Sequence, residues 1–128
     1  LAKEICKNII LKLILEVGEL GSYENIYKAS KIALEAGADF IKTSTGKIEK
    51  GADVYSFAIM LMALKDYYNK TGILKSIKAA GGISTLEQAL DYYILFSYFI
   101  GEENINSKYF RIGGSRLKDN LVDYILNN

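Results

Sequence analysis

Short hydrophobic runs alternate with longer amphipathic segments along the chain. Residues 10–17 (ILKLILEV) are rich in branched apolar side chains and end at Gly18, as expected of a buried strand. Residues 23–36 then place apolar side chains at helical spacing and are closed by Gly37. This pattern predicts a strand followed by a helix.

The same strand–helix unit occurs three more times. Ser84 stands where an N-cap belongs, and Glu87 follows three residues later, so a capping box is predicted to open the third of the four helices. Residues 1–8 resemble the end of a helix. The other predicted strands are residues 38–42, 74–78 and 108–112, and the other predicted helices are residues 52–69, 84–99 and 117–126.

Four successive units predict an α/β fold with a parallel sheet, because parallel neighbours need a helix-length return path. A doubly wound sheet and a TIM barrel both satisfy this order. A TIM barrel has eight such units in about 250 residues, whereas this chain has half that number in 128 residues. These numbers correspond to half of a barrel, and the doubly wound sheet stays open as the alternative.

Composition narrows the possible functions. The 16 basic and 15 acidic residues give a net charge of +1 and form no basic stripe, which argues against nucleic acid and anionic membrane as partners. The absence of histidine and the single cysteine exclude the usual zinc, Cys/His and Ser/His/Asp sites. Cys6 is expected to be a core thiol in a reducing, cytoplasmic protein. The apolar stretch 92–100 is shorter than the roughly 20 residues of a membrane helix.

Polar and glycine-rich clusters follow each predicted strand directly. Such residues also form ordinary turns, but the loops after the second, third and fourth strands, taken together, favour a site at the carboxyl edge of the sheet. The clusters are Gly18-Glu19, Lys42-Thr43-Ser44-Thr45-Gly46-Lys47, Lys78-Ala79-Ala80-Gly81-Gly82 and Gly113-Gly114-Ser115.

Lys42 and Lys78 each end a hydrophobic strand, and neighbouring strands lie about 4.8 Å apart. Two ammonium groups about 5 Å apart repel by about 3 kcal/mol at an effective dielectric constant near 20. One amine of the pair is therefore neutral more often than a surface lysine, and a neutral amine is what attack on a carbonyl requires. The alternative is that both are solvated strand-end residues.

Lys47 fits phosphate binding better than Schiff-base chemistry, and the two glycine doublets are also candidates for phosphate binding. Lys47 lies in a loop, one residue beyond Gly46. The two doublets precede helices, where backbone N–H groups bind phosphate in many barrels. On the first strand, Lys12, Ile14 and Glu16 alternate and therefore point to the same face of the sheet. We expect Lys12 and Glu16 to form a buried ion pair or to take part in a proton-transfer network.

Four segments resemble the motifs of the deoxyribose-phosphate aldolases, in order and with similar spacing. The resemblance spans nearly the whole chain, and its most specific parts are ADFIKTSTG and KAAGGI. The segments are LKLILEVGEL from Leu11, AGADFIKTSTGK from Ala36, KAAGGIST from Lys78 and FRIGGSRL from Phe110.

The resemblance implies a class I aldolase that reversibly cleaves 2-deoxy-D-ribose 5-phosphate to D-glyceraldehyde 3-phosphate and acetaldehyde, without a metal or an organic cofactor. It implies that residues 1–128 are the C-terminal half of a TIM (β/α)8 barrel, strands 5 to 8 with their helices, and that the N-terminal half is absent. By motif, Lys42 resembles the Schiff-base lysine and Lys78 the second lysine, whose charge favours the neutral form of the first. Thr45 resembles a substrate-hydroxyl contact. The residues that resemble the phosphate cradle are Gly46, Lys47, Gly81, Gly82, Gly113, Gly114 and Ser115.

Two departures accompany the resemblance. No segment matches the family's proton-transfer aspartate, which lies on an earlier strand, so activity of these residues alone is in doubt. Arg116 stands where some members have a serine, and it is either a further phosphate contact or a neutral difference. The alternatives are a non-catalytic phosphate-binding half-barrel and another Schiff-base phosphosugar aldolase. A half-barrel has two open sheet edges, so we expect a homodimer or a separate N-terminal half to cover them.

Overall fold

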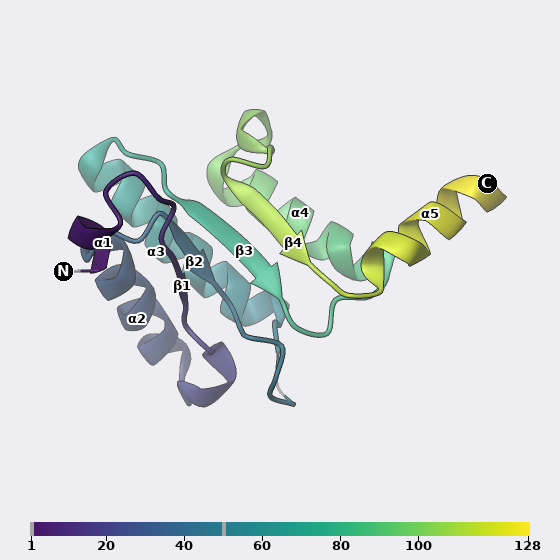
Figure 1. The fold of residues 1–128 in the computed structure, drawn as a ribbon, viewed down its shortest axis with the longest axis horizontal. Helices are drawn as coiled ribbons and strands as arrows, with labels where there is room; N and C mark the ends of the chain where they lie inside the picture. The colour runs from purple at the N-terminus through teal and green to yellow at the C-terminus, as the bar shows by residue number, and fades with distance from the viewer. Residues whose placement is uncertain (1, 50) are drawn as a thin grey trace.

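A computed structural model of the chain describes residues 2–49 and 51–128. Four parallel strands form one sheet in the order β1-β2-β3-β4, and each is followed by a helix, as predicted (Figure 1). The strands are β1 (Lys12–Ile14), β2 (Phe40–Lys42), β3 (Ser76–Ala80) and β4 (Phe110–Gly113), and the helices are α1 (Ala2–Ile5), α2 (Tyr23–Glu35), α3 (Val54–Thr71), α4 (Leu86–Ile100) and α5 (Leu117–Asn127).

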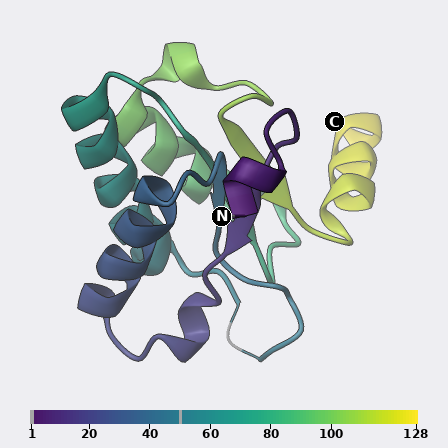
Figure 2. The same ribbon diagram turned by 60° about the vertical axis from the view of Figure 1, so that its left-hand side comes forward.

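One face of the sheet is covered by α2, α3 and α4 (Figure 1). Ile41, Ile77 and Phe110 are in register across β2, β3 and β4, and all three are buried in the core under these helices. Phe96 of α4 stacks on Phe110 with ring centroids 4.8 Å apart. Both views place α5 beyond β4, away from α2 (Figure 2).

The residues that follow Ile41, Ile77 and Phe110 lie on the opposite face of the sheet, because side chains alternate along a strand. Lys42 pairs with Lys78, and Lys78 pairs with Arg111. Phe40 shares this face and is only 2% exposed, since Lys12 Nζ lies 5.0 Å and the Arg111 guanidinium 4.5 Å from the centre of its ring. This face is therefore lined by cations.

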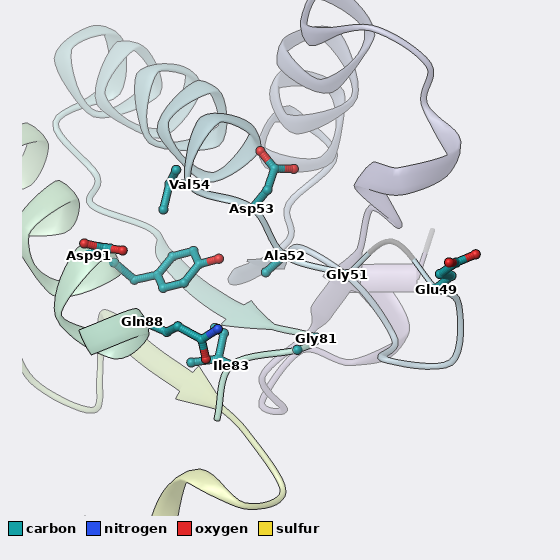
Figure 3. Close-up of a pocket in the computed structure, with 11 residues that line it drawn as sticks. Glu49, Gly51, Ala52, Asp53, Val54, Gly81, Ile83, Gln88 and Asp91 are labelled. Carbon is teal, nitrogen blue, oxygen red and sulfur yellow. The ribbon is translucent and has the colours of Figure 1, made fainter. Parts of the chain in front are cut away.

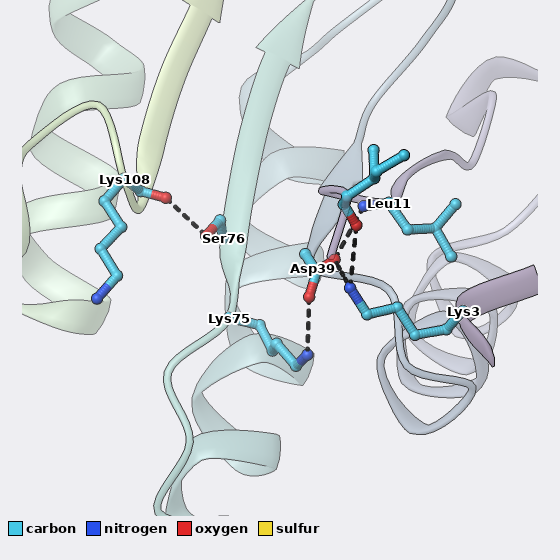
Figure 4. Close-up of polar contacts among 7 residues, drawn as sticks. Lys3, Leu11, Asp39, Lys75, Ser76 and Lys108 are labelled. Atoms are coloured by element: carbon cyan, nitrogen blue, oxygen red, sulfur yellow. Dashed lines mark hydrogen bonds and ion pairs between the residues drawn. The ribbon is translucent and has the colours of Figure 1, made fainter. Parts of the chain in front are cut away.

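The amino ends of the strands are held together by Asp39 (Figure 4). Its carboxylate accepts hydrogen bonds from the Leu11 N–H at 2.8 Å and from Lys3, and Lys75 Nζ lies 3.4 Å away. Beside it, Ser76 Oγ donates to the Lys108 carbonyl at 2.7 Å. These contacts fix the amino edge of the sheet and leave the carboxyl edge for the loops that carry the predicted site.

Three local expectations were wrong. The first strand covers Lys12–Ile14 rather than residues 10–17, because Glu16 has a left-handed φ of 52° and a short 3-10 helix, Val17–Glu19, follows. The capping box of α4 is Thr85 with Gln88, one residue beyond the predicted Ser84 and Glu87. Cys6 is partly exposed rather than buried in the core.

The predicted helix end at residues 1–8 corresponds to α1, and Leu1 lies outside the described residues. The other element boundaries differ from the predictions by only one or two residues. No helix in the described residues is both long and apolar enough to cross a bilayer.

Candidate active site

The carboxyl edge of the sheet contains a cavity of about 560 Å³. All the predicted catalytic and binding residues line it, together with Arg116, so the structure brings them into one place. The predicted residues are Lys42, Lys78, Thr45, Gly46, Lys47, Gly81, Gly82, Gly113, Gly114 and Ser115.

The two lysines leave adjacent strands on the same face, because Lys42 and Lys78 are direct register partners. Burial lowers the pKa of Lys78 from its ordinary value, and the charges of Lys42 and Arg111 lower it further. Within residues 2–49 and 51–128, no carboxylate forms an ion pair with either lysine. Burial and the neighbouring cations therefore disfavour the protonated form of Lys78.

Gly113 makes room for the side chain of Lys78. A Cβ atom added to Gly113 would lie 2.7 Å from Lys78 Cε and 3.2 Å from its Nζ. Both distances are shorter than an ordinary van der Waals contact, so any larger residue would displace the end of Lys78. The end of the Lys78 side chain thus occupies space that a side chain at position 113 would need.

Two buried hydroxyls join the loop after β2 to the end of β3. Thr43 Oγ1 donates to the Ala80 carbonyl at 2.8 Å and accepts from the Ala80 N–H at 2.9 Å. Ser44 Oγ donates to the same carbonyl at 2.9 Å. A Cβ atom at Gly81 would lie 2.5 Å from Ser44 Oγ, and the φ of Gly81 is +107°. Only glycine fits there, so the two loops are held close together.

Thr45 is tied to Glu16 rather than left free. Its hydroxyl donates to the Glu16 carboxylate at 2.6 Å, and its N–H lies 3.2 and 3.1 Å from the two carboxylate oxygens. The expected ion pair between Lys12 and Glu16 is wrong, because Lys12 lies over the Phe40 ring instead. The reason is that β1 ends at Ile14, so Glu16 no longer follows strand parity.

The glycine doublets offer free backbone donors. Among the described residues, the N–H groups of Gly81, Gly82, Gly114 and Ser115 donate to no acceptor. Gly114 approaches the Ile83 carbonyl so closely that a Cβ atom would lie 2.2 Å from its oxygen. Helix α5 begins at Leu117, two residues after Ser115. Such groups suit a phosphate.

A model of the DeoC/LacD family aldolases matches residues 1–94. The chain belongs to the DeoC/LacD aldolase family. The deoxyribose-phosphate aldolases of Mus musculus and Homo sapiens are 43% and 42% identical to it over 126 residues. Each alignment covers 98% of this chain but 40% of the relative, so the chain spans less than half the length of these relatives.

Solved structures of aldolases agree with the half-barrel fold. A Toxoplasma gondii protein proposed to be a deoxyribose-phosphate aldolase superposes with a TM-score of 0.83 at 28% identity, over 98% of this chain and 50% of the other. The aldolase QR15 superposes with a TM-score of 0.68 at 26% identity, again over 98% of this chain and 50% of the other. The four βα units correspond to half of a TIM-barrel aldolase of this family.

Four contributors to the site of this family member are not predicted from the sequence: Arg111, Thr43, Ser44 and the contact between Glu16 and Thr45. Arg111 is one, and strand parity could have found it, since it stands two residues before Gly113 and faces the same side. Thr43 and Ser44 were noted only as loop residues, although both are fully buried. The Glu16–Thr45 contact has no signal in the sequence, because it depends on the left-handed turn at Glu16.

A second cavity of about 340 Å³ lies behind Gly81 and Gly82, outside the cradle. Glu49, Asp53 and Asp91 line it, but Figure 3 shows their carboxylates pointing in different directions. Burial raises the pKa of Tyr92 on its wall to about 12, with Asp53 and Asp91 adding to the shift. Within the described residues, no group of three or more acidic or cysteine side chains converges as metal ligands would.

Proposed function

We propose that the protein carrying this chain reversibly cleaves 2-deoxy-D-ribose 5-phosphate to D-glyceraldehyde 3-phosphate and acetaldehyde. The observation that carries the proposal is the single cavity lined by the paired lysines and the glycine cradle. The names of the mouse and human relatives support the same substrate class. Lys42 forms the Schiff base, and Lys78 acts as its charged neighbour.

The chemistry follows from the positions of the charges. The neutral Lys42 amine attacks the aldehyde carbon C1, and loss of water gives a protonated imine that accepts electrons. As the C3 hydroxyl loses its proton, the C2–C3 bond breaks and its electron pair passes to the imine, leaving an enamine. Glyceraldehyde 3-phosphate departs. Protonation of the enamine at C2 and addition of water then release acetaldehyde and the free lysine.

Phosphate binding is assigned to the loops at the carboxyl edge. The free N–H groups of Gly81, Gly82, Gly114 and Ser115 bind the phosphate oxygens, and Lys47 and Arg116 supply positive charge from the rim. Thr45, between Lys42 and this cradle in the loop, contacts a substrate hydroxyl. In this arrangement the phosphate anchors one end of the sugar while Lys42 holds the other.

The proposal includes the remaining half of a barrel. Leu13 and Ile14 of β1 are about 40% exposed at one edge of the sheet, and Val122 and Ile125 of α5 are exposed at the other end. An N-terminal half of the same protein or a second copy would cover them, and an N-terminal half would also carry the aspartate that accepts the C3 hydroxyl proton. The unpaired Cys6 is compatible with a reducing cytoplasm.

Product analysis tests the proposal. The protein at its natural length is incubated with 2-deoxy-D-ribose 5-phosphate, and acetaldehyde and glyceraldehyde 3-phosphate are measured. Both should form in equal amounts. Cleavage of a different phosphosugar alone would indicate another Schiff-base aldolase. Binding of inorganic phosphate with no cleavage of any sugar would indicate a non-catalytic phosphate-binding protein.

A further inference from the structure

The contact between Glu16 and Thr45 brings the end of β1 against the loop that carries Lys42. Leu15 N–H donates to the Lys42 carbonyl at 2.9 Å, and Val17 N–H donates to the Thr43 carbonyl at 3.0 Å. Glu16 lies between these two anchors and is the one non-glycine residue with a positive φ in the described chain. A non-glycine residue adopts this conformation only where its surroundings hold it there. The turn thus directs the Glu16 side chain to Thr45.

The hydrogen bonds around Thr45 Oγ1 fix its orientation. The hydroxyl hydrogen is given to Glu16 Oε2 at 2.6 Å, and one lone pair accepts the Lys47 N–H at 3.1 Å. A hydroxyl has one donor and two acceptor positions, so a single lone pair remains. In this state Thr45 can accept a hydrogen bond from a ligand but cannot donate one.

We propose that Glu16 is a positioning residue that keeps Thr45 as a pure hydrogen-bond acceptor, and thereby selects substrates with a free hydroxyl beside the reacting carbon. The inference rests on the proposed function. Glyceraldehyde 3-phosphate has one hydroxyl between its aldehyde carbon and its phosphate, and this hydroxyl donates to Thr45 Oγ1. An acceptor aldehyde without the hydroxyl leaves the Thr45 oxygen unpaired and is used less well.

Two amide variants test this role, because both remove the charge and differ only in reach. Glu16 Oε2 alone accepts from both the hydroxyl and the N–H of Thr45. Glu16→Gln therefore retains an oxygen at this position. Glu16→Asn is one methylene too short to reach Thr45, although asparagine tolerates a positive φ well. Both variants should fold, because the contact is exposed.

The readout is a preference between two acceptors in the synthetic direction. The protein at its natural length is given acetaldehyde with either D-glyceraldehyde 3-phosphate or 3-oxopropyl phosphate, which lacks the hydroxyl, and the ratio of kcat/KM values is measured. The ratio is kcat/KM for D-glyceraldehyde 3-phosphate divided by kcat/KM for 3-oxopropyl phosphate. Glu16→Gln should keep this ratio within about twofold of the wild-type value, whereas Glu16→Asn should lower it about tenfold, the effect of one hydrogen bond of about 1.4 kcal/mol. Reduction of the acetaldehyde imine at Lys42 should be unchanged in both.

A second comparison separates positioning from direct contact. In a Thr45→Val background, Glu16→Asn should have no further effect on the ratio, because Glu16 acts through the Thr45 hydroxyl. An equal ratio in the Asn and Gln variants, or a further loss in the double variant, overturns the inference. A wild-type protein that forms no imine and cleaves no deoxyribose 5-phosphate instead overturns the proposed function.

Discussion

The end of the Lys78 side chain lies directly over Gly113 of the neighbouring strand. An added Cβ at Gly113 would come within 2.7 Å of Lys78 Cε, and the φ of Gly113 is not in the left-handed region. An alanine there is therefore compatible with the backbone and conflicts mainly with the lysine. The glycine of β4 sets where the second amine of the site lies.

We predict that Gly113→Ala lowers kcat/KM about a hundredfold, since a displacement of about 1 Å in a catalytic group has an effect of this size. The melting temperature should change little, because the flexible end of Lys78 can move. Gly114→Ala is the matched control: its Cβ meets the Ile83 carbonyl oxygen at 2.2 Å, so it should destabilise the fold by about 2 kcal/mol. Equal thermal destabilisation by the two substitutions would contradict this difference.

Removal of Lys78 should stabilise the fold at neutral pH. The pKa of Lys78 is lowered from its ordinary value of 10.5 by burial and then by Lys42 and Arg111, so the unfolded chain binds more protons between the two values. Stability therefore rises with pH across that interval. Lys78→Met should be more stable than the wild type at pH 7, by less than the Coulomb limit of about 3 kcal/mol, and the difference should shrink towards pH 10.5.

Urea unfolding at low salt, at pH 7 and pH 10, measures this effect of Lys78, because an uncharged denaturant does not screen the repulsion. Lys65→Met, on the exposed side of α3, is the control for loss of a lysine charge. A Lys78→Met protein that is less stable than the wild type by the same amount at both pH values would show that the charge of Lys78 does not destabilise the fold.

Thr43 should contribute more to stability than its place in a loop suggests. Thr43→Val leaves the Ala80 N–H without its hydrogen bond, while Ser44 still serves the Ala80 carbonyl. An unsatisfied buried donor costs about 2 kcal/mol, which urea unfolding can measure. Thr43→Ser keeps the hydroxyl and should lose less than about 1 kcal/mol. If Val and Ser are equally destabilising, packing of the Thr43 methyl group, rather than the hydrogen bonds, is responsible.

Asp39 should make stability sensitive to acid. Burial by itself would raise its pKa, but the hydrogen bonds from Lys3 and Leu11 and the charge of Lys75 outweigh it and lower the pKa below 3.8. The stabilisation is present above pH 3.8 and is lost as the pH falls through the lowered value. Asp39→Asn should lower the free energy of unfolding by about 1 kcal/mol at pH 7 and should leave it unchanged at a pH where the wild-type carboxyl is protonated. A difference that is the same at pH 7 and pH 2.5 would contradict the ion-pair explanation.

The order of the strands and helices can be predicted from the sequence, because the spacing of apolar residues and the glycines that end each element depend only on nearby residues. The clustering of the site follows too, since parallel strands bring their carboxyl ends to one edge. The exact capping box could not be predicted: Ser84 and Thr85 can both cap a helix, and Glu87 and Gln88 can both complete the box. The choice depends on where the chain leaves β3, which is a tertiary property.

The contacts that refine the site are also tertiary. The role of Gly113 depends on which way Lys78 leans across the sheet, and the Glu16–Thr45 bond depends on a left-handed turn that interrupts a hydrophobic run. β-Branched residues at positions 9, 10, 14 and 17 favour a longer strand than the Lys12–Ile14 strand that forms. The turn at Glu16 replaces strand pairing with hydrogen bonds to the next loop, and no local pattern signals this exchange.

The central claim is that Lys42, beside Lys78, forms the imine. The most direct measurement is reduction with borohydride in the presence of acetaldehyde, followed by peptide mass analysis of the protein at its natural length. We predict an N-ethyl group on Lys42, its loss in Lys42→Ala, and its retention with a displaced pH profile in Lys78→Ala. A folded protein that acquires no adduct on Lys42 at saturating acetaldehyde, or one modified on Lys78 instead, would contradict the account.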